Sequence, residues 1–202
     1  MKRLVKLVIL AGALTLAIAA TALAASTKVT GGTTTLTASD AAAKVLSDNH
    51  ITVMPLAPAT ASGLTFTFPI TGGRLNTTTN HGVIRDGGGV SVSNGTNTVA
   101  LRHPTIVSDK NGVSVLAEVR GKTARVCRHF GKRHARVRCV VIARVRSVRI
   151  ARVTDVSVSA GKATGTAKLT EFSARLINRL AGKQVVAAGD VLGTATVSPT
   201  LK

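Results

Sequence analysis

Four side chains that can bind metals or form disulfides lie close together in one basic segment of the chain. They are Cys127, His129, His134 and Cys139, with the spacing C-x-H-x4-H-x4-C. Cys and His are the usual ligands of structural zinc. However, the segment between the cysteines also carries five Lys or Arg side chains, which would repel a dication, and no carboxylate lies nearby to orient the histidines. We therefore predict a disulfide between the two cysteines, with a zinc site as the alternative.

The first 24 residues read as a secretory signal peptide, and this supports the disulfide. A basic start precedes an apolar run over 7–20, and Ala22-Leu23-Ala24 is a small-x-small cleavage signal. An uncleaved membrane anchor is the alternative. No later apolar stretch approaches the length of a membrane span, so we expect a secreted or cell-surface protein. Outside the cell the cysteines meet an oxidising environment, where a bridge over so short a loop contributes about 3 kcal/mol.

Positive charge is concentrated around the cysteines. The chain has 27 Lys and Arg against 8 Asp and Glu, and twelve of the basic residues lie within 120–152, which contains no acid. The predicted contacts to a polyanion are Arg125, Arg128, Lys132, Arg133, Arg136 and Arg138. Such a surface suits an anionic cell-envelope polymer or lipid, although the arginines of a soluble hairpin can also be merely solvated. Sequence-specific nucleic-acid binding is not expected, because Phe130 is the one aromatic residue among the arginines.

The same segment has the pattern of two long strands. Val and Ile alternate with Arg on both sides of the cysteine loop, which predicts strands within 113–153 joined by a basic tip. Arg146 and Val148 share parity, and this slip predicts a bulge or bend near Ser147.

The remaining elements are short strands and two helices. Apolar alternation predicts a strand over 64–70 followed by a turn over 71–73, and two Asn-Gly pairs (94–95 and 111–112) predict hairpins. A capping-box pattern at 37–40 begins one predicted helix. Thr170 and Gly182 cap the second, over 171–181. We therefore expect a mainly β fold, an antiparallel β-sandwich with a short helix near each end of one domain spanning 33–199, after a flexible segment over 25–32.

The sequence does not indicate an enzyme. None of the eight acidic residues pairs with a His or Ser in a recognisable motif, and the chain contains neither G-x-S-x-G nor H-E-x-x-H. We therefore predict a non-catalytic binding or surface-structural module.

Four segments together resemble the HtaA domain family of secreted and surface proteins of actinobacteria. These are PITGGRLN (69–76), GVIRDGGGVSV (82–92), VALRHPTIVSDKNGVSVLAEV (99–119) and LTEFSARLINRLAGKQVVAAGDVLGTATV (169–197). The resemblance covers about 33–198 and implies a mainly β domain that, in the studied members, binds haem at the cell surface.

The resemblance also suggests which residues could contact a ligand. Family haem sites use a Tyr, which this chain lacks, and the family often carries a His at the position of Asp86. His81 and His103 are the nearby histidines. The residues implied for a ligand site are therefore His81, Asp86 and His103, with haem as a possible ligand and no resident cofactor or metal expected.

Overall fold

A computed structural model gives the fold of residues 26–130 and 136–202, with the side chains of the long hairpin described as far as Gly121 and again from Ser147. The signal-peptide prediction lies outside these residues. Within them, no helix is long and apolar enough to cross a membrane. The elements in chain order are β1 (Ser26–Ala38), α1 (Asp40–Asp48), β2 (Thr52–Leu56), β3 (Thr60–Ser62), β4 (Thr65–Asn76), β5 (Gly82–Asp86), β6 (Gly89–Ser93), β7 (Thr98–Asp109), β8 (Gly112–Phe130), β9 (Arg136–Ser159), β10 (Lys162–Leu169), α2 (Glu171–Ala181) and β11 (Val191–Leu201).

Eight of these strands form a closed barrel. Antiparallel pairing runs β1-β11-β10-β9-β8-β7-β5-β4 and returns from β4 to β1. The predicted sandwich is therefore wrong in its architecture, although the mainly β content and the two helices are confirmed. The difference arises because β1 pairs with β11 along one edge and with β4 along the other, and β7 pairs with β8, so no barrel strand keeps the free edge that a sandwich would leave.

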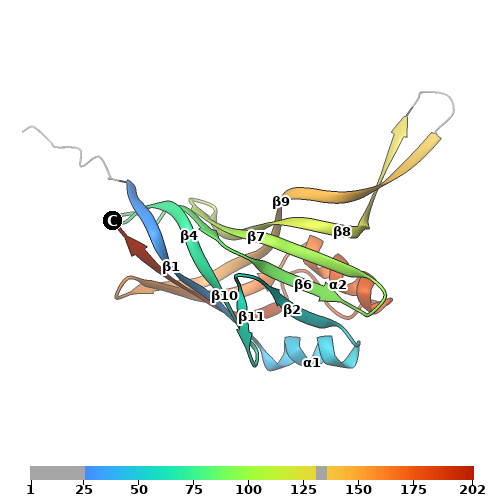
Figure 1. Cartoon of the computed structure of the whole chain (residues 1–202), viewed down its shortest axis with the longest axis horizontal. Coiled ribbons are helices and arrows are strands. Elements are labelled where there is room, and N and C mark those ends of the chain that lie inside the picture. The colour runs from blue at the N-terminus through green and yellow to red at the C-terminus, as the bar shows by residue number, and fades with distance from the viewer. Residues whose placement is uncertain (1–25, 131–135) are drawn as a thin grey trace, which may run out of the picture.

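Two short strands branch from the barrel at β7. The first half of β7 pairs with β6 and the second half with β5, and the change of partner occurs at His103, which has a φ of 50°. β2 then pairs with the outer edge of β6 (Figure 1). Both Asn-Gly hairpins are confirmed, since these pairs join β6 to β7 and β7 to β8.

Glycines allow the strands to bend around the ring. The turn predicted over 71–73 is wrong, because β4 continues through it to Asn76 with a register shift between Ile70 and Gly72. Gly73 has a φ of 156°, and a β-carbon there would lie 2.2 Å from the carbonyl oxygen of Val83. The Gly pair therefore makes a bulge within the strand instead of a turn.

The N-terminal segment expected to be flexible is part of β1. Residues 26–29 pair with 73–76 of β4, and the Val29 side chain is only 1% exposed. Val29 packs with Ile70, Ile84 and Ile106 in a cluster inside the barrel. The domain therefore begins several residues before the predicted boundary.

The two helices begin and end at local signals. α2 has the predicted caps: Thr170 Oγ1 accepts from the Ser173 N–H at 3.3 Å, and Gly182 is left-handed with a φ of 71°. α1 begins two residues later than the capping-box pattern suggests, because Ser39 Oγ accepts from the Ala42 N–H at 3.2 Å.

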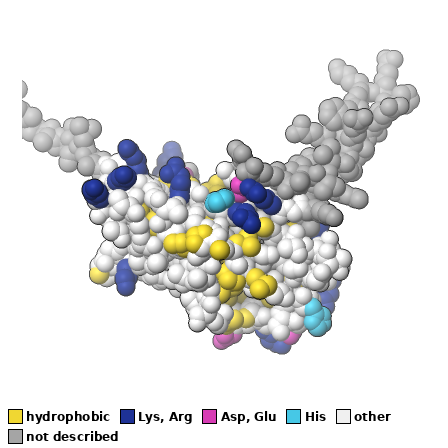
Figure 2. Space-filling model, viewed as in Figure 1, with side chains coloured by type: hydrophobic (Ala, Val, Ile, Leu, Met, Phe, Trp, Pro, Cys, Tyr) yellow, Lys and Arg dark blue, Asp and Glu magenta, His cyan; other side chains and the backbone are white. Residues whose placement is uncertain are grey.

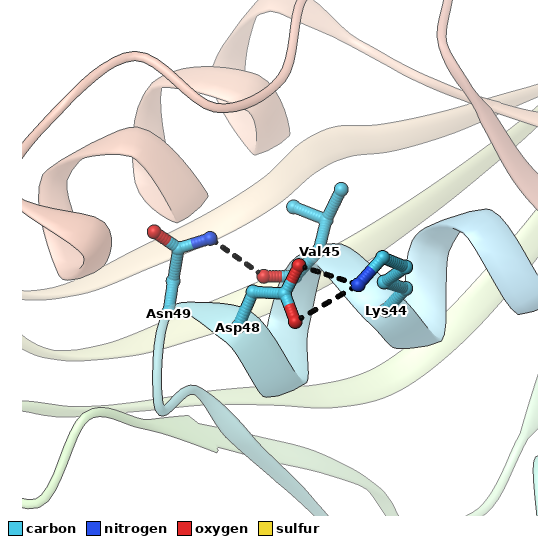
Figure 3. A network of polar contacts seen from close by, with 4 residues as sticks. All are labelled: Lys44, Val45, Asp48 and Asn49. Carbon is cyan, nitrogen blue, oxygen red and sulfur yellow. Dashed lines mark hydrogen bonds and ion pairs between the residues drawn. The ribbon is translucent and has the colours of Figure 1, made fainter.

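The C-terminal end of α1 is held by side chains of its last turn. Asn49 Nδ2 donates to the Val45 carbonyl at 2.7 Å, and Lys44 forms an exposed ion pair with Asp48 at 3.0 Å (Figure 3). Exposed ion pairs of this kind contribute less than about 1 kcal/mol. The hydrogen bond from the Asn49 side chain to the Val45 carbonyl is therefore the more important of the two contacts.

Candidate functional site: a cavity inside the barrel

Small side chains on one strand leave space inside the barrel. Along most of β10 the residues that face the interior are small, namely Ala163, Gly165 and Ala167, and Ala195 continues this surface on β11. The result is a cavity of about 990 Å³. Because successive residues of a strand face opposite sides, the A-x-G-x-A pattern keeps the inward side chains of β10 small as far as Ala167, and Leu169 at the end of the strand is the one large inward side chain.

The wall across the ring from β10 is made of larger side chains. Its apolar residues come mainly from β4, β5 and β7: Phe66, Phe68, Ile84, Leu101 and Ile106. Figure 2 shows hydrophobic side chains in a band across the middle of one face, with Lys and Arg mainly along its upper border. The cavity thus offers an apolar interior in a strongly basic chain.

The two ends of the cavity differ. At one end it is lined by α1 and α2 and by the segment after α1, through Leu46, Ile51, Leu176 and Ile177. The opposite end is lined by the strand ends that carry Val158 and Leu201, whose side chains are 51% and 41% exposed. Apolar side chains of the cavity wall therefore reach solvent at this end of the barrel.

One carboxyl group lies on the cavity wall, at the end of β5. Asp86 is 3% exposed, and its Oδ1 accepts a hydrogen bond from Thr34 Oγ1 of β1 at 3.0 Å. Its Oδ2 is buried without a hydrogen-bond partner among the described residues. Burial raises the pKa of Asp86 to about 7, while the hydrogen bond from Thr34 acts in the opposite direction.

The glycines after Asp86 fix its position. Gly87 N–H donates to the Pro69 carbonyl at 2.8 Å, and Gly88 has a φ of 77°. A β-carbon on Gly88 would lie 2.4 Å from the carbonyl oxygen of Leu56. The loop is therefore pressed against the end of β2, which leaves the preceding carboxyl turned to the interior.

The wall is almost free of charge. Among the described residues that line the cavity, the ionisable ones are Asp86 and His50, and none is Lys or Arg. His50 follows α1 and has an exposed side chain. Within the described parts of the chain there is also no group of three or more His, Cys, Asp or Glu that could hold a metal ion.

The structure separates the three residues that the sequence grouped as a ligand site. Asp86 lines the cavity, whereas His81 is exposed just before β5 and His103 is exposed at the β7 bulge. The His103 N–H donates to the Gly88 carbonyl at 2.8 Å, which ties that bulge to the glycine loop. Sequence reasoning missed Thr34 and the small residues of β10, although the A-x-G-x-A alternation was a readable signal.

The cysteines and the basic residues lie on the β8–β9 hairpin. The backbone register pairs Cys127 directly with Cys139. The side chains of 122–146 and the tip at 131–135 lie outside what the structure describes, so the disulfide, the zinc alternative and the polyanion contacts stay predictions. The two long strands are confirmed, and so is the bend near Ser147, which has a φ of 57° beside a register shift.

Comparison with known proteins identifies the fold. No protein-family model matches the chain, and no curated protein matches it. Solved structures do match, among them three from Corynebacterium glutamicum. The N-terminal domain of HtaA superposes with a TM-score of 0.58 at 12% identity over 85% of this chain and 98% of that domain. The C-terminal domain of HtaA gives 0.57 at 16% identity over 87% and 99%. The heme-binding protein HtaB gives 0.54 at 14% identity over 88% and 96%.

This chain has the HtaA fold. The resemblance read from the four sequence segments is thereby confirmed at the level of architecture. At these identities the likeness extends to the fold and not to the ligand.

Proposed function

We propose that this HtaA-like chain is a non-catalytic binding module that holds a small, largely apolar molecule inside the barrel. The observation that carries the proposal is the cavity itself, at about 990 Å³ with an apolar wall. Ligand pockets of proteins have volumes of about 300–1,000 Å³ and are lined mainly by apolar side chains with a few polar groups. The reading of residues 1–24 as a signal peptide supports a role outside the cell.

Haem is the ligand that the name of HtaB suggests. The cavity suits the apolar body of a porphyrin, but its wall fits iron poorly. Haem iron is held by His, Cys, Met or Tyr; of these types the described wall carries His50 alone, and the chain has no Tyr. Asp86 is not a residue type that usually serves as an axial ligand. We therefore propose a ligand without a metal ion as the natural occupant.

A dye that fluoresces only in apolar surroundings tests the proposal. Diphenylhexatriene has no polar group, and we expect it to bind the exported chain saturably. Ala195→Phe places a large ring in the cavity and should abolish most of this binding. Thr194→Phe is the matched control, because Thr194 is the neighbouring β11 residue and is exposed outside the barrel. Thermal unfolding of both variants checks that the barrel is intact.

Equal dye binding by all three proteins would contradict a site inside the barrel. Should Ala195→Phe unfold, Ala163→Leu fills the same wall with a smaller side chain and gives the same comparison.

The hairpin favours a second candidate function, binding of an anionic envelope polymer. β8 pairs with β7 only as far as Gly121, and beyond it β8 and β9 pair with each other alone, as an arm that extends away from the barrel (Figure 1). The register sets Arg128 opposite Arg138. Like charges directly opposite each other destabilise a strand pair, and a bound anion would relieve this repulsion.

A further inference from the structure

The buried carboxyl of the cavity has one oxygen without a hydrogen-bond partner. Thr34 satisfies Oδ1 of Asp86, and Oδ2 has no partner within the described chain. An acceptor buried without a donor costs about 1–3 kcal/mol, and more when the group is charged. Oδ2 is therefore the place on this wall where a donor would be most favourable.

The other two buried polar side chains of the cavity wall, Ser173 and Thr34, have partners already. Ser173 Oγ donates to the Ile150 carbonyl at 2.5 Å, and Thr34 Oγ1 is used on Asp86. His50 lies at the helical end of the cavity with an exposed side chain. Among the buried side-chain oxygens of the described wall, Oδ2 of Asp86 is therefore the one that lacks a partner.

The charge of the wall discriminates against acids. A ligand carboxylate placed in the barrel would meet the Asp86 carboxyl and no Lys or Arg among the described lining residues. Without a cation to compensate, a buried carboxylate is strongly disfavoured. This is notable because the chain as a whole has a formal charge of +19, which by itself would attract anions.

We propose that the ligand of the cavity is an apolar molecule with a hydrogen-bond donor, an amine or a hydroxyl, which it places on Oδ2 of Asp86. This inference rests on the proposed function, since it requires that the barrel binds a ligand at all. It adds the polar group that the ligand carries and the class that the site rejects, namely fatty acids and other apolar carboxylates.

Competition among three ten-carbon compounds tests the inference. Decylamine, decanol and decanoic acid share one chain and differ in the polar group, and each is titrated against bound diphenylhexatriene at pH 8. At that pH the carboxyl of Asp86, with a pKa of about 7, is mostly ionised and accepts hydrogen bonds. We expect the amine and the alcohol to displace the dye at concentrations at least about tenfold lower than the acid does.

Asp86→Asn and Asp86→Leu identify the residue responsible. Leu removes both oxygens and should reduce the preference to what burial of the decanoate charge alone imposes, while dye binding persists. Asn keeps the side-chain volume and should reduce the preference severalfold, because its amide has only one acceptor atom, and it keeps the comparison available if the Leu variant does not fold. Asp48→Asn is the matched control, since Asp48 is an exposed acid on α1, and its preference should equal that of the unsubstituted chain.

The outcomes separate the two proposals. If the dye binds but the three compounds compete equally, or the acid competes best, the donor inference is wrong and the binding module stands. The inference is also wrong if the preference is undiminished in Asp86→Leu. If neither the dye nor any compound binds, the proposed function itself fails, and the inference fails with it. A stronger effect of the amine identifies a cation as the donor, and equal effects of amine and alcohol identify a neutral hydrogen bond.

Discussion

A hydrogen bond inside the barrel joins Thr34 to Asp86, although a third strand lies between the strands that carry them. Thr34 is on β1 and Asp86 on β5, and both strands pair with β4, yet Thr34 Oγ1 lies 3.0 Å from Asp86 Oδ1. The contact is possible because both side chains point into the ring. It connects the N-terminal strand to the glycine loop, and it places a titratable group in an apolar interior.

This burial predicts that stability falls as the pH rises. The pKa of Asp86 is about 7 in the folded chain against 3.8 for an unperturbed Asp, so the folded state binds the proton more tightly. The contribution is complete below pH 4 and is lost as the pH rises through 7, by about 4 kcal/mol in total. Urea unfolding at pH 5 and pH 8 should show about 3 kcal/mol of this loss, because part of it has already occurred between pH 4 and pH 5.

Asp86→Asn removes the titration and supplies the comparison. Its free energy of unfolding should change much less between the two pH values, and at pH 8 it should exceed that of the unsubstituted chain. Asp155→Asn, at an exposed acid of β9, should keep the original pH dependence. A pH dependence unchanged in Asp86→Asn would show that another group is responsible.

Local signals predicted the parts of this fold that depend on neighbouring residues. The caps of α2 at Thr170 and Gly182 are set within one turn of helix, and the Asn-Gly hairpins are set within four residues. The closed ring could not be read in the same way, because it depends on pairs such as Thr34 with Val197, which are far apart in the chain. Alternation shows that a strand has an inner face, but not which strand lies beside it.

The candidate site, too, was predicted from the sequence only in part. Asp86 was selected because the family resemblance implied a ligand residue at its position, but its burial follows from the register of β5 against β4 and from the packing of Gly88 against the end of β2. His81 lies before β5 and His103 lies at the bulge of β7, and both side chains are exposed outside the cavity. Nearness to Asp86 in the sequence therefore did not show which side chains face the interior.

Haem titration should give no spectrum of a tightly ligated iron. Absorbance of haemin is followed as the purified chain is added, and we expect at most a weak, unspecific change, because the described cavity wall offers His50 as its one side chain of a usual ligand type. His50→Ala is the matched variant. A sharp Soret shift that disappears in His50→Ala would establish a haem site and overturn the assignment of a metal-free ligand.

The cysteine pair should be oxidised and should stabilise the arm rather than the barrel. Directly opposed residues of antiparallel strands have Cα atoms about 4.5–5.5 Å apart, within the range that a disulfide spans, and Cys127 and Cys139 have this register. Thiol titration of the purified chain should find no free thiol. Reduction should then speed tryptic cleavage within 120–152 with little change in the melting temperature, because no third strand supports the arm beyond Gly121.

The zinc alternative gives the opposite pattern. Two free thiols that react slowly only when zinc is present would exclude the disulfide. In the proteolysis experiment the double variant Cys127→Ser with Cys139→Ser is the control, since trypsin should cleave it at the same rate with and without reductant.

Binding to an anionic polymer should depend on where the positive charges lie and not on their number. Replacing Arg128, Arg133, Arg136 and Arg138 by Gln removes four charges from the arm. The matched control removes four exposed charges elsewhere, at Lys28, Arg74, Lys110 and Lys183, so both variants have the same net charge. If the arm is the binding surface, retention on a polyphosphate resin should be lost at a lower salt concentration for the arm variant than for the control, because clustered charges produce a stronger local potential than dispersed ones. Equal retention of the two variants would mean that the resin responds to overall charge, and the arginines of the arm would then be solvated residues of a hairpin with another role.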